Sequence, residues 1–188
     1  MTFLKDYNWS SVGFNFLLGA VAIEWHFIVD LIFNKGDLKV SYATMFNCEF
    51  AAGAVLISFG AVLGKVSHLQ LVIMTLMEVI FYKFNEHTAL HWNKTEGFRD
   101  VGGSMIIHAF GAYFGLAASK VLYNDRHKNS DKEGADYKTD LFAMIGTIFL
   151  WMYWPSFNSI PETDGYTRQI IAINTYAALA AACVTKKF

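Results

Sequence analysis

The charged residues of this chain are gathered into short clusters, and the long stretches between them contain no Asp, Glu, Lys or Arg. Six such stretches occur, at Tyr7 to Ile23, Phe50 to Gly64, Val66 to Met77, Val101 to Ser119, Leu141 to Pro161 and Gln169 to Thr185. A helix needs about 20 apolar residues to cross the hydrocarbon core of a bilayer, and fewer where neighbouring helices shield a polar group. The pattern therefore predicts six membrane-spanning helices, near residues 11–33, 42–63, 70–91, 102–123, 141–159 and 170–184.

The composition supports an all-α integral membrane protein and excludes several other classes. Of the 188 residues, 54% are hydrophobic and 16% are charged, whereas soluble domains are about 25% charged. The net charge of −1 offers no basic surface for nucleic acid, and two cysteines are too few for a disulfide scaffold. The His, Cys, Asp and Glu residues lack the spacing of metal ligands. We therefore expect a lipid bilayer as the surroundings, and no nucleic acid, metal or cofactor.

The basic residues predict an orientation in the membrane. Counted by alternating sides of six helices, nine Lys and Arg residues fall on the side of the charged loop 124–140, and six fall on the other side. Cytoplasmic loops carry the excess of basic residues, so we place loop 124–140 in the cytoplasm. The opposite side then contains Asn93, which begins an Asn-Lys-Thr acceptor sequence for glycosylation.

Each of the first three predicted helices contains acidic residues, among them Glu24, Asp30, Glu49 and Glu78. A charge facing lipid is costly, so we expect these side chains to face protein or water.

The fourth predicted helix contains the residues that best fit a functional site. Asp100 stands where a helix N-cap belongs, since its carboxylate can accept hydrogen bonds from the N–H groups of the first turn. His108 lies in the middle of the uncharged stretch, where an imidazole needs a polar partner or a cavity. Gly111 and Gly115 have the spacing of close helix packing. In the fifth helix, Trp151, Tyr153 and Trp154 are typical of an aromatic belt at the membrane interface.

Several long segments resemble one known family. The segments Asp100 to Leu116 (DVGGSMIIHAFGAYFGL), 140–147 (DLFAMIGT) and 150–159 (LWMYWPSFNS) closely resemble the Rh glycoproteins of the ammonium transporter, Mep and Rh superfamily. Segments 10–18 and 59–67 resemble the same family, so the similarity covers nearly the whole chain. The resemblance implies an ammonium-transporter-like bundle of eleven or twelve helices, of which this chain has six. Residues 1–188 are then a single partial domain.

The resemblance also implies a function and a set of site residues. Members assemble as homotrimers, and each protomer has a narrow, mostly apolar pore for ammonia. By this likeness Asp100 is the acid at the outer end of the pore, and His108 is the first of two histidines in the lumen. Phe50 and Phe157 match the two phenylalanines that close the pore, and Glu86 matches an acid of the outer vestibule.

One departure from the family limits this interpretation. The second pore histidine is expected on a later helix, and none of the other five histidines occurs in the matching context; these are His26, His68, His87, His91 and His127. We interpret the chain as a fragment, a truncated gene model or a short splice form.

The predicted function is therefore a passive Rh-type channel for ammonia or ammonium in the plasma membrane, with carbon dioxide as a further candidate substrate. The alternative is a non-conducting structural subunit or truncated isoform that assembles with full-length Rh proteins, as a homotrimer or hetero-oligomer. An enzyme is not expected, because the sequence shows no pairing of a nucleophile with a base.

Overall fold

The computed structural model describes residues 4–34, 36, 40–95, 99–125 and 130–185. Within these residues the chain is helical, and its one β-type pairing is an isolated antiparallel bridge between Leu4 and Ala135. The predicted all-α fold class is confirmed. The elements of the described residues are α1 (Asn8–Phe33), α2 (Tyr42–Val62), α3 (His68–Thr95), the π-helical turn η1 (Ser104–Ala109), α4 (Phe110–Val121), the 3-10 turn η3 (Asp131–Glu133), α5 (Tyr137–Ser159) and α6 (Gly165–Thr185).

Polar residues at the helix starts explain several of these boundaries. The Ser41 hydroxyl accepts a hydrogen bond from the Thr44 backbone N–H at 3.2 Å and so caps α2. Asp136 and Thr139 form a reciprocal capping box at the start of α5, in which the Thr139 N–H donates to Asp136 Oδ1 at 2.7 Å. Such caps satisfy the N–H groups of the first turn, which have no partner inside the helix.

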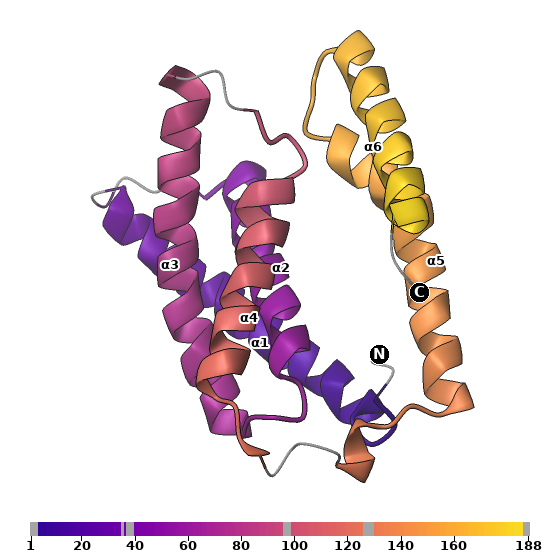
Figure 1. The fold of residues 1–188 in the computed structure, drawn as a ribbon. Helices are drawn as coiled ribbons and strands as arrows, with labels where there is room; N and C mark the ends of the chain where they lie inside the picture. The colour runs from indigo at the N-terminus through magenta and orange to yellow at the C-terminus, as the bar shows by residue number, and fades with distance from the viewer. Residues whose placement is uncertain (1–3, 35, 37–39, 96–98, 126–129, 186–188) are drawn as a thin grey trace.

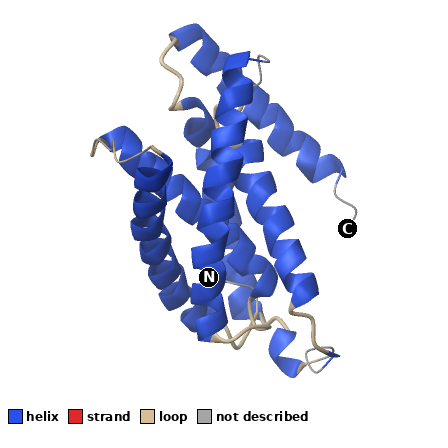
Figure 2. Ribbon diagram, turned by 90° about the vertical axis from the view of Figure 1, so that its left-hand side faces the viewer, coloured by secondary structure: helices blue, strands red, loops and turns tan. Residues whose placement is uncertain are grey.

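The helices form a group of four and a pair. Figure 1 shows α1, α2, α3 and α4 packed side by side, while α5 and α6 stand beside them as a second unit. Figure 2, viewed from the side, shows the long helices running up and down in a bundle. The charged segment between α4 and α5 links the two units along the chain, and it is a long connection.

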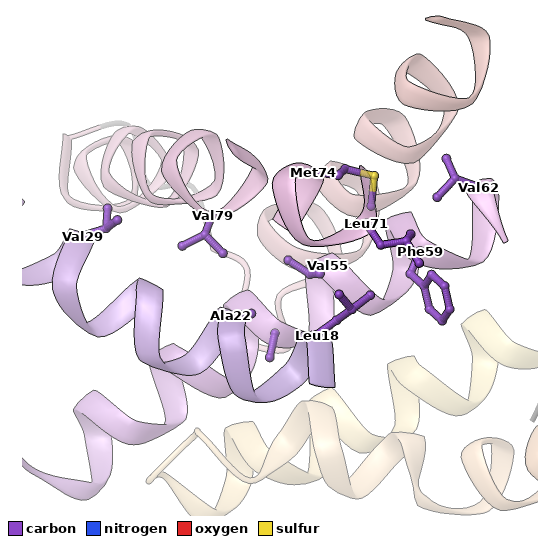
Figure 3. Close-up of a cluster of buried hydrophobic side chains, with 10 residues drawn as sticks. Leu18, Ala22, Val29, Val55, Phe59, Val62, Leu71, Met74 and Val79 are labelled. Atoms are coloured by element: carbon purple, nitrogen blue, oxygen red, sulfur yellow. The ribbon is translucent and has the colours of Figure 1, made fainter. Parts of the chain in front are cut away.

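Interlocking aliphatic side chains fill the space between α1, α2 and α3. In Figure 3 Leu18 of α1 extends toward Val55 and Phe59 of α2, and Val79 of α3 lies above Ala22. Leu18, Ala22 and Val55 are fully buried. In lipid such contacts act through close packing and not through removal of apolar surface from water, because acyl chains are as apolar as the side chains.

Two glycines allow α4 to lie unusually close to α2. A Cβ atom added at Gly111 would lie 2.7 Å from the Ala54 carbonyl oxygen, and one added at Gly115 would lie 2.8 Å from the Ser58 Cα atom. No real Cβ fits at those distances, so both positions require glycine at this helix spacing. The prediction that these glycines serve helix packing is confirmed.

Two helices of the described residues, α1 and α2, are long and apolar enough on their own to cross a membrane. Large hydrophobic side chains are also exposed on the outside of the bundle, among them Phe16, Leu69 and Tyr113. Apolar surface of this extent suits lipid or further protein and not water.

The four acids that are expected to face protein or water fall into two classes. Asp30 and Glu78 are buried against protein, as expected, whereas Glu24 and Glu49 are exposed on the surface of the described bundle. Only the first two are therefore held by contacts within this chain.

Candidate functional site

Asp100 organises the start of the helix that carries His108. Its Oδ2 atom accepts hydrogen bonds from the backbone N–H groups of Met105 at 2.9 Å and Ile106 at 2.8 Å. These donors lie five and six residues further along the chain, beyond the reach of an ordinary N-cap bond. Asp100 thus caps the helix, as its position in the sequence suggests, but it does so across an extra turn.

Gly103 turns the chain between Asp100 and this helix. Its φ of 71° lies in the left-handed region that glycine adopts without strain. Its carbonyl oxygen accepts from the N–H groups of both Ile107 at 2.8 Å and His108 at 3.1 Å. The second of these bonds spans five residues, which is the mark of a π-helix. A single helix is predicted over residues 102–123, whereas the structure begins this segment with the wider turn η1 and continues it as α4.

The His108 side chain is held by the same carbonyl group. Its Nδ1 atom lies 3.1 Å from the Gly103 oxygen. A carbonyl oxygen can only accept a hydrogen bond, so Nδ1 must carry the hydrogen. In the neutral ring Nε2 is then left with a free lone pair and acts as an acceptor. The backbone of η1 therefore fixes both the orientation and the tautomer of the half-buried imidazole.

Two aromatic rings of α5 contact His108, and one of them also contacts a ring of α2. The ring of Trp154 meets the imidazole edge-on with centroids 4.8 Å apart, and the ring of Phe157 does so at 6.2 Å. Trp154 and Phe157 stack on each other at 4.9 Å, and Phe157 also contacts Phe50 of α2 in a T-shaped arrangement at 6.2 Å. We call Phe50, His108, Trp154 and Phe157 the aromatic cluster. It joins three elements that are far apart in the sequence.

Trp154 belongs to this site, although the sequence predicts an aromatic belt at the membrane interface. Its half-buried ring packs on Phe157 and His108. The three-residue spacing of Trp154 and Phe157 indicates that the two rings lie together, because residues three apart on a helix share a face. Trp151, three residues before Trp154, and Tyr153 are both exposed.

A pocket of about 530 Å³ lies beside the aromatic cluster, between the Asp100 turn and α5 and α6. Asp100, Ser104, Trp154 and Asn158 contribute to its lining. Trp154 thus belongs both to the wall of this pocket and to the aromatic cluster. The Asn158 side chain is buried and donates to Thr175 Oγ1 of α6 at 3.2 Å, which ties α6 to this end of the site.

Glu86 lies in a buried group of ionisable side chains between α1 and α3. Lys83 Nζ is 2.6 Å from Glu86 Oε2 and also pairs with Asp30 of α1. His26, which is fully buried, places Nε2 3.9 Å from Glu86 Oε2 and Nδ1 3.4 Å from the Cys48 sulfur. We call Asp30, Lys83 and Glu86 the ionic network. With 5% of its surface exposed, Glu86 does not present its carboxylate at an open entrance in this chain, and its vestibule role stays a prediction.

The predicted glycosylation site falls outside the description of side chains. Asn93 lies in the last turns of α3, where the backbone but not the side chain belongs to the described part of the structure.

Comparison with known proteins gives a consistent result. The model of the Ammonium Transporter Family matches residues 1–188. Ammonium transporter Rh type B-B of Xenopus laevis is 51% identical over 185 residues, which are 96% of this chain and 40% of that protein. Ammonium transporter Rh type B of Homo sapiens has the same identity and coverage. Ammonium transporter Rh type C of Canis lupus familiaris is 48% identical over 189 residues, with 98% of this chain and 40% of that protein covered.

A solved structure supports the same grouping at the level of the fold. The structure described as Nitrosomonas europaea Rh50, with the mechanism of conduction by the Rhesus protein family of channels, matches with a TM-score of 0.82 and 32% identity. The match covers 97% of this chain and 48% of that chain. The chain therefore spans about two fifths to one half of the length of the relatives that it matches.

Proposed function

The chain belongs to the ammonium transporter family, within its Rh-type members, and we propose that it forms part of a passive pore through which ammonia crosses the membrane uncharged. The family is one of membrane transporters and not of enzymes. The observation that carries the proposal is the aromatic cluster, in which an imidazole with a free acceptor nitrogen contacts the rings of Trp154 and Phe157, and Phe157 contacts Phe50.

The physical difficulty in this transport is the charge of ammonium. Moving an ion of this size from water into a medium of low dielectric constant has an idealised cost of about 20 kcal/mol. Neutral ammonia avoids most of that cost, but it still loses hydrogen bonds to water. A pore therefore has to separate ammonia from its proton and then offer a few polar contacts in an otherwise apolar path.

His108 supplies such a contact. Because Nδ1 donates to the Gly103 carbonyl, Nε2 is an acceptor for an N–H group of ammonia. The aromatic walls offer no comparable bond. Sodium and potassium ions would lose their hydration shells here and gain no ring of oxygen ligands in return, so the site rejects them.

Phe50 and Phe157 form the entrance to this site in the proposal. Their T-shaped contact joins α2 to α5 across the approach to His108. The face of an aromatic ring attracts a cation by about 0.5 to 2 kcal/mol, depending on its exposure to water. Ammonium is thus held at the ring faces and, before or at this pair, gives its proton to water on the outer side, so that neutral ammonia enters. Asp100, at the outer end, holds the turn that precedes His108.

Assembly and location follow the family pattern in the proposal. We place the protein in the plasma membrane as a homotrimer or as a subunit of an Rh hetero-oligomer, with Asn93 on the outer side. The exposed hydrophobic side chains of the described helices support contact with lipid and with further protein.

The test uses a chimera, because the chain spans only part of its relatives. Residues 1–188 replace the matching 40% of the Xenopus laevis protein, and the purified chimera is reconstituted in lipid vesicles. An ammonium gradient is imposed, and the rise in internal pH reports the entry of ammonia. We expect flux in the chimera and a loss of about fivefold or more on His108→Ala, since a lost contact of about 1 kcal/mol changes a rate by this factor.

A matched histidine variant controls for general damage. His68 is exposed at the start of α3 and packs against Phe14, with ring centroids 4.5 Å apart. It is not a member of the aromatic cluster. His68→Ala is expected to leave the flux unchanged. Equal flux in His108→Ala and the chimera would refute the role of His108. An assembled chimera without flux would favour the alternative of a non-conducting structural subunit.

A further inference from the structure

A second buried carboxyl group lies next to the helix that carries His108. Glu78 of α3 has no exposed surface. Its Oε1 atom contacts the hydroxyl group of Ser58 in α2, and its Oε2 atom is buried without a hydrogen-bond partner. The ion pairs of the described residues involve other side chains of α3, Lys83 and Glu86, and none involves Glu78.

The hydrogen-bond partners of Ser58 determine which group carries the proton. The Ser58 oxygen is within bonding distance of Glu78 Oε1 and lies 2.8 Å from the carbonyl oxygen of Gly111 in α4. A serine hydroxyl has one hydrogen, and a carbonyl oxygen can only accept. If Ser58 donates to Gly111, the contact with Glu78 requires a hydrogen on the carboxyl group. Glu78 then donates to Ser58, and Ser58 donates to Gly111.

The surroundings support the same assignment. An ionised carboxylate without exposed surface and without a cation beside it is very unfavourable, and such a group is found neutral instead. If Glu78 is a carboxylic acid that donates through Oε1, the unpartnered Oε2 is a neutral carbonyl oxygen. It then carries no share of a negative charge. Both the count of donors and the burial therefore point to the neutral form.

The bonds from Glu78 reach the segment that contains the pore histidine. Gly111 follows His108 by three residues, and it is one of the two glycines at which α4 approaches α2 closely. We propose that Glu78 is a carboxylic acid that keeps its proton and that, through Ser58 and Gly111, it positions the His108 segment against α2 and α3. The protonation does not depend on the proposed function, whereas the positioning of His108 for ammonia transport rests on it.

Infrared spectroscopy tests the protonation directly in the full 188-residue chain. A protonated carboxyl group absorbs in a region separate from carboxylates, and its band shifts when the proton is exchanged for deuterium. The spectrum at neutral pH is compared with that of Glu78→Gln, in which an amide can donate to Ser58 in the same way. We expect the substitution to remove a carboxylic acid band. Loss of a carboxylate band instead would overturn the assignment. Glu24→Gln, at an exposed position, is the control that provides a reference spectrum for the loss of a carboxylate band.

Flux measurements in the chimera test the positioning. We expect Glu78→Gln to keep the flux within about twofold, because the amide preserves the donated bond, and Glu78→Ala to lower it at least fivefold in protein that still assembles. Assembled Glu78→Ala with full flux would overturn the positioning role. Assembled Glu78→Gln without flux would overturn the fixed proton, since transport would then need a carboxyl group that titrates. A parent chimera without flux would refute the proposed function and leave the infrared result intact.

Discussion

Replacing Lys83 by methionine is expected to destabilise the protein strongly, because it removes the one cation of the ionic network. Lys83 pairs with Asp30 on α1 and with Glu86 one turn away on α3, and the side chains of the three residues are 9%, 11% and 7% exposed. Methionine keeps much of the length and the apolar stem of lysine. The substitution therefore leaves packing largely in place and leaves two carboxylates buried without a counter-ion.

The expected loss follows from the number of charges that are left unpaired. Removing one partner of a buried ion pair costs about 3–5 kcal/mol. A hydrogen bond between membrane helices is worth only about 0.6 kcal/mol on average. A decrease of about 3 kcal/mol in the free energy of unfolding of Lys83→Met would thus be caused by the two unpaired carboxylates and not by a missing hydrogen bond.

The assay is reversible unfolding in mixed micelles of lipid and sodium dodecyl sulfate, followed by circular dichroism. Lys120→Met, at an exposed position of α4, serves as the control and should change stability by less than about 0.5 kcal/mol. The triple variant Asp30→Asn, Lys83→Met, Glu86→Gln should recover most of the loss, because replacing a whole buried ionic group is often neutral. Equal effects of Lys83→Met and Lys120→Met would refute the reasoning.

Two further predictions concern helix packing and helix capping. Gly111→Ala should destabilise the chain by about 1–3 kcal/mol, since the new Cβ would meet a backbone oxygen at 2.7 Å, whereas Gly146→Ala, with open space around it, should be neutral or stabilising in the same unfolding assay. Hydrogen bonding from the Thr139 backbone N–H, the largest cause, lowers the pKa of Asp136. The stability that this cap provides is present above the unfolded-state pKa of about 4 and is lost as the pH falls through the lowered folded-state pKa. Unfolding measured against pH should show a shallower loss in acid for Asp136→Asn than for the parent, and identical slopes would contradict the capping role.

The helices could be predicted from the sequence because a bilayer leaves the backbone few choices. Without water, every N–H and C=O group needs a partner within the protein, and a helix provides these bonds within one segment. Long runs without charges therefore predict helices without any knowledge of packing. The same reasoning does not predict η1, because the π-helical turn depends on where the Asp100 carboxylate finds its donors, and those are Met105 and Ile106.

The site could be predicted only in part for a related reason. Spacing along one helix relates Trp154 to Phe157, and Lys83 to Glu86, but it does not relate Phe50 on α2 to Phe157 on α5. That pairing came from the resemblance to a family, and the structure places the two rings 6.2 Å apart. In the same way, helical spacing does not indicate that Asp30 would join Lys83, since the two residues are on different helices. Contacts between helices depend on packing, which a single sequence does not display.

His108 is held from both sides along the chain, and this explains why its segment departs from regular helix. Before it, the Gly103 carbonyl binds both its backbone N–H and its ring, at 3.1 Å in each case. After it, the Gly111 carbonyl binds Ser58 of α2. A regular helix would use the Gly103 oxygen for Ile107 alone and would leave the imidazole free to rotate. The wider turn thus gives up ideal backbone geometry and fixes one ring nitrogen, which in the proposed pore leaves the other available to a neutral base.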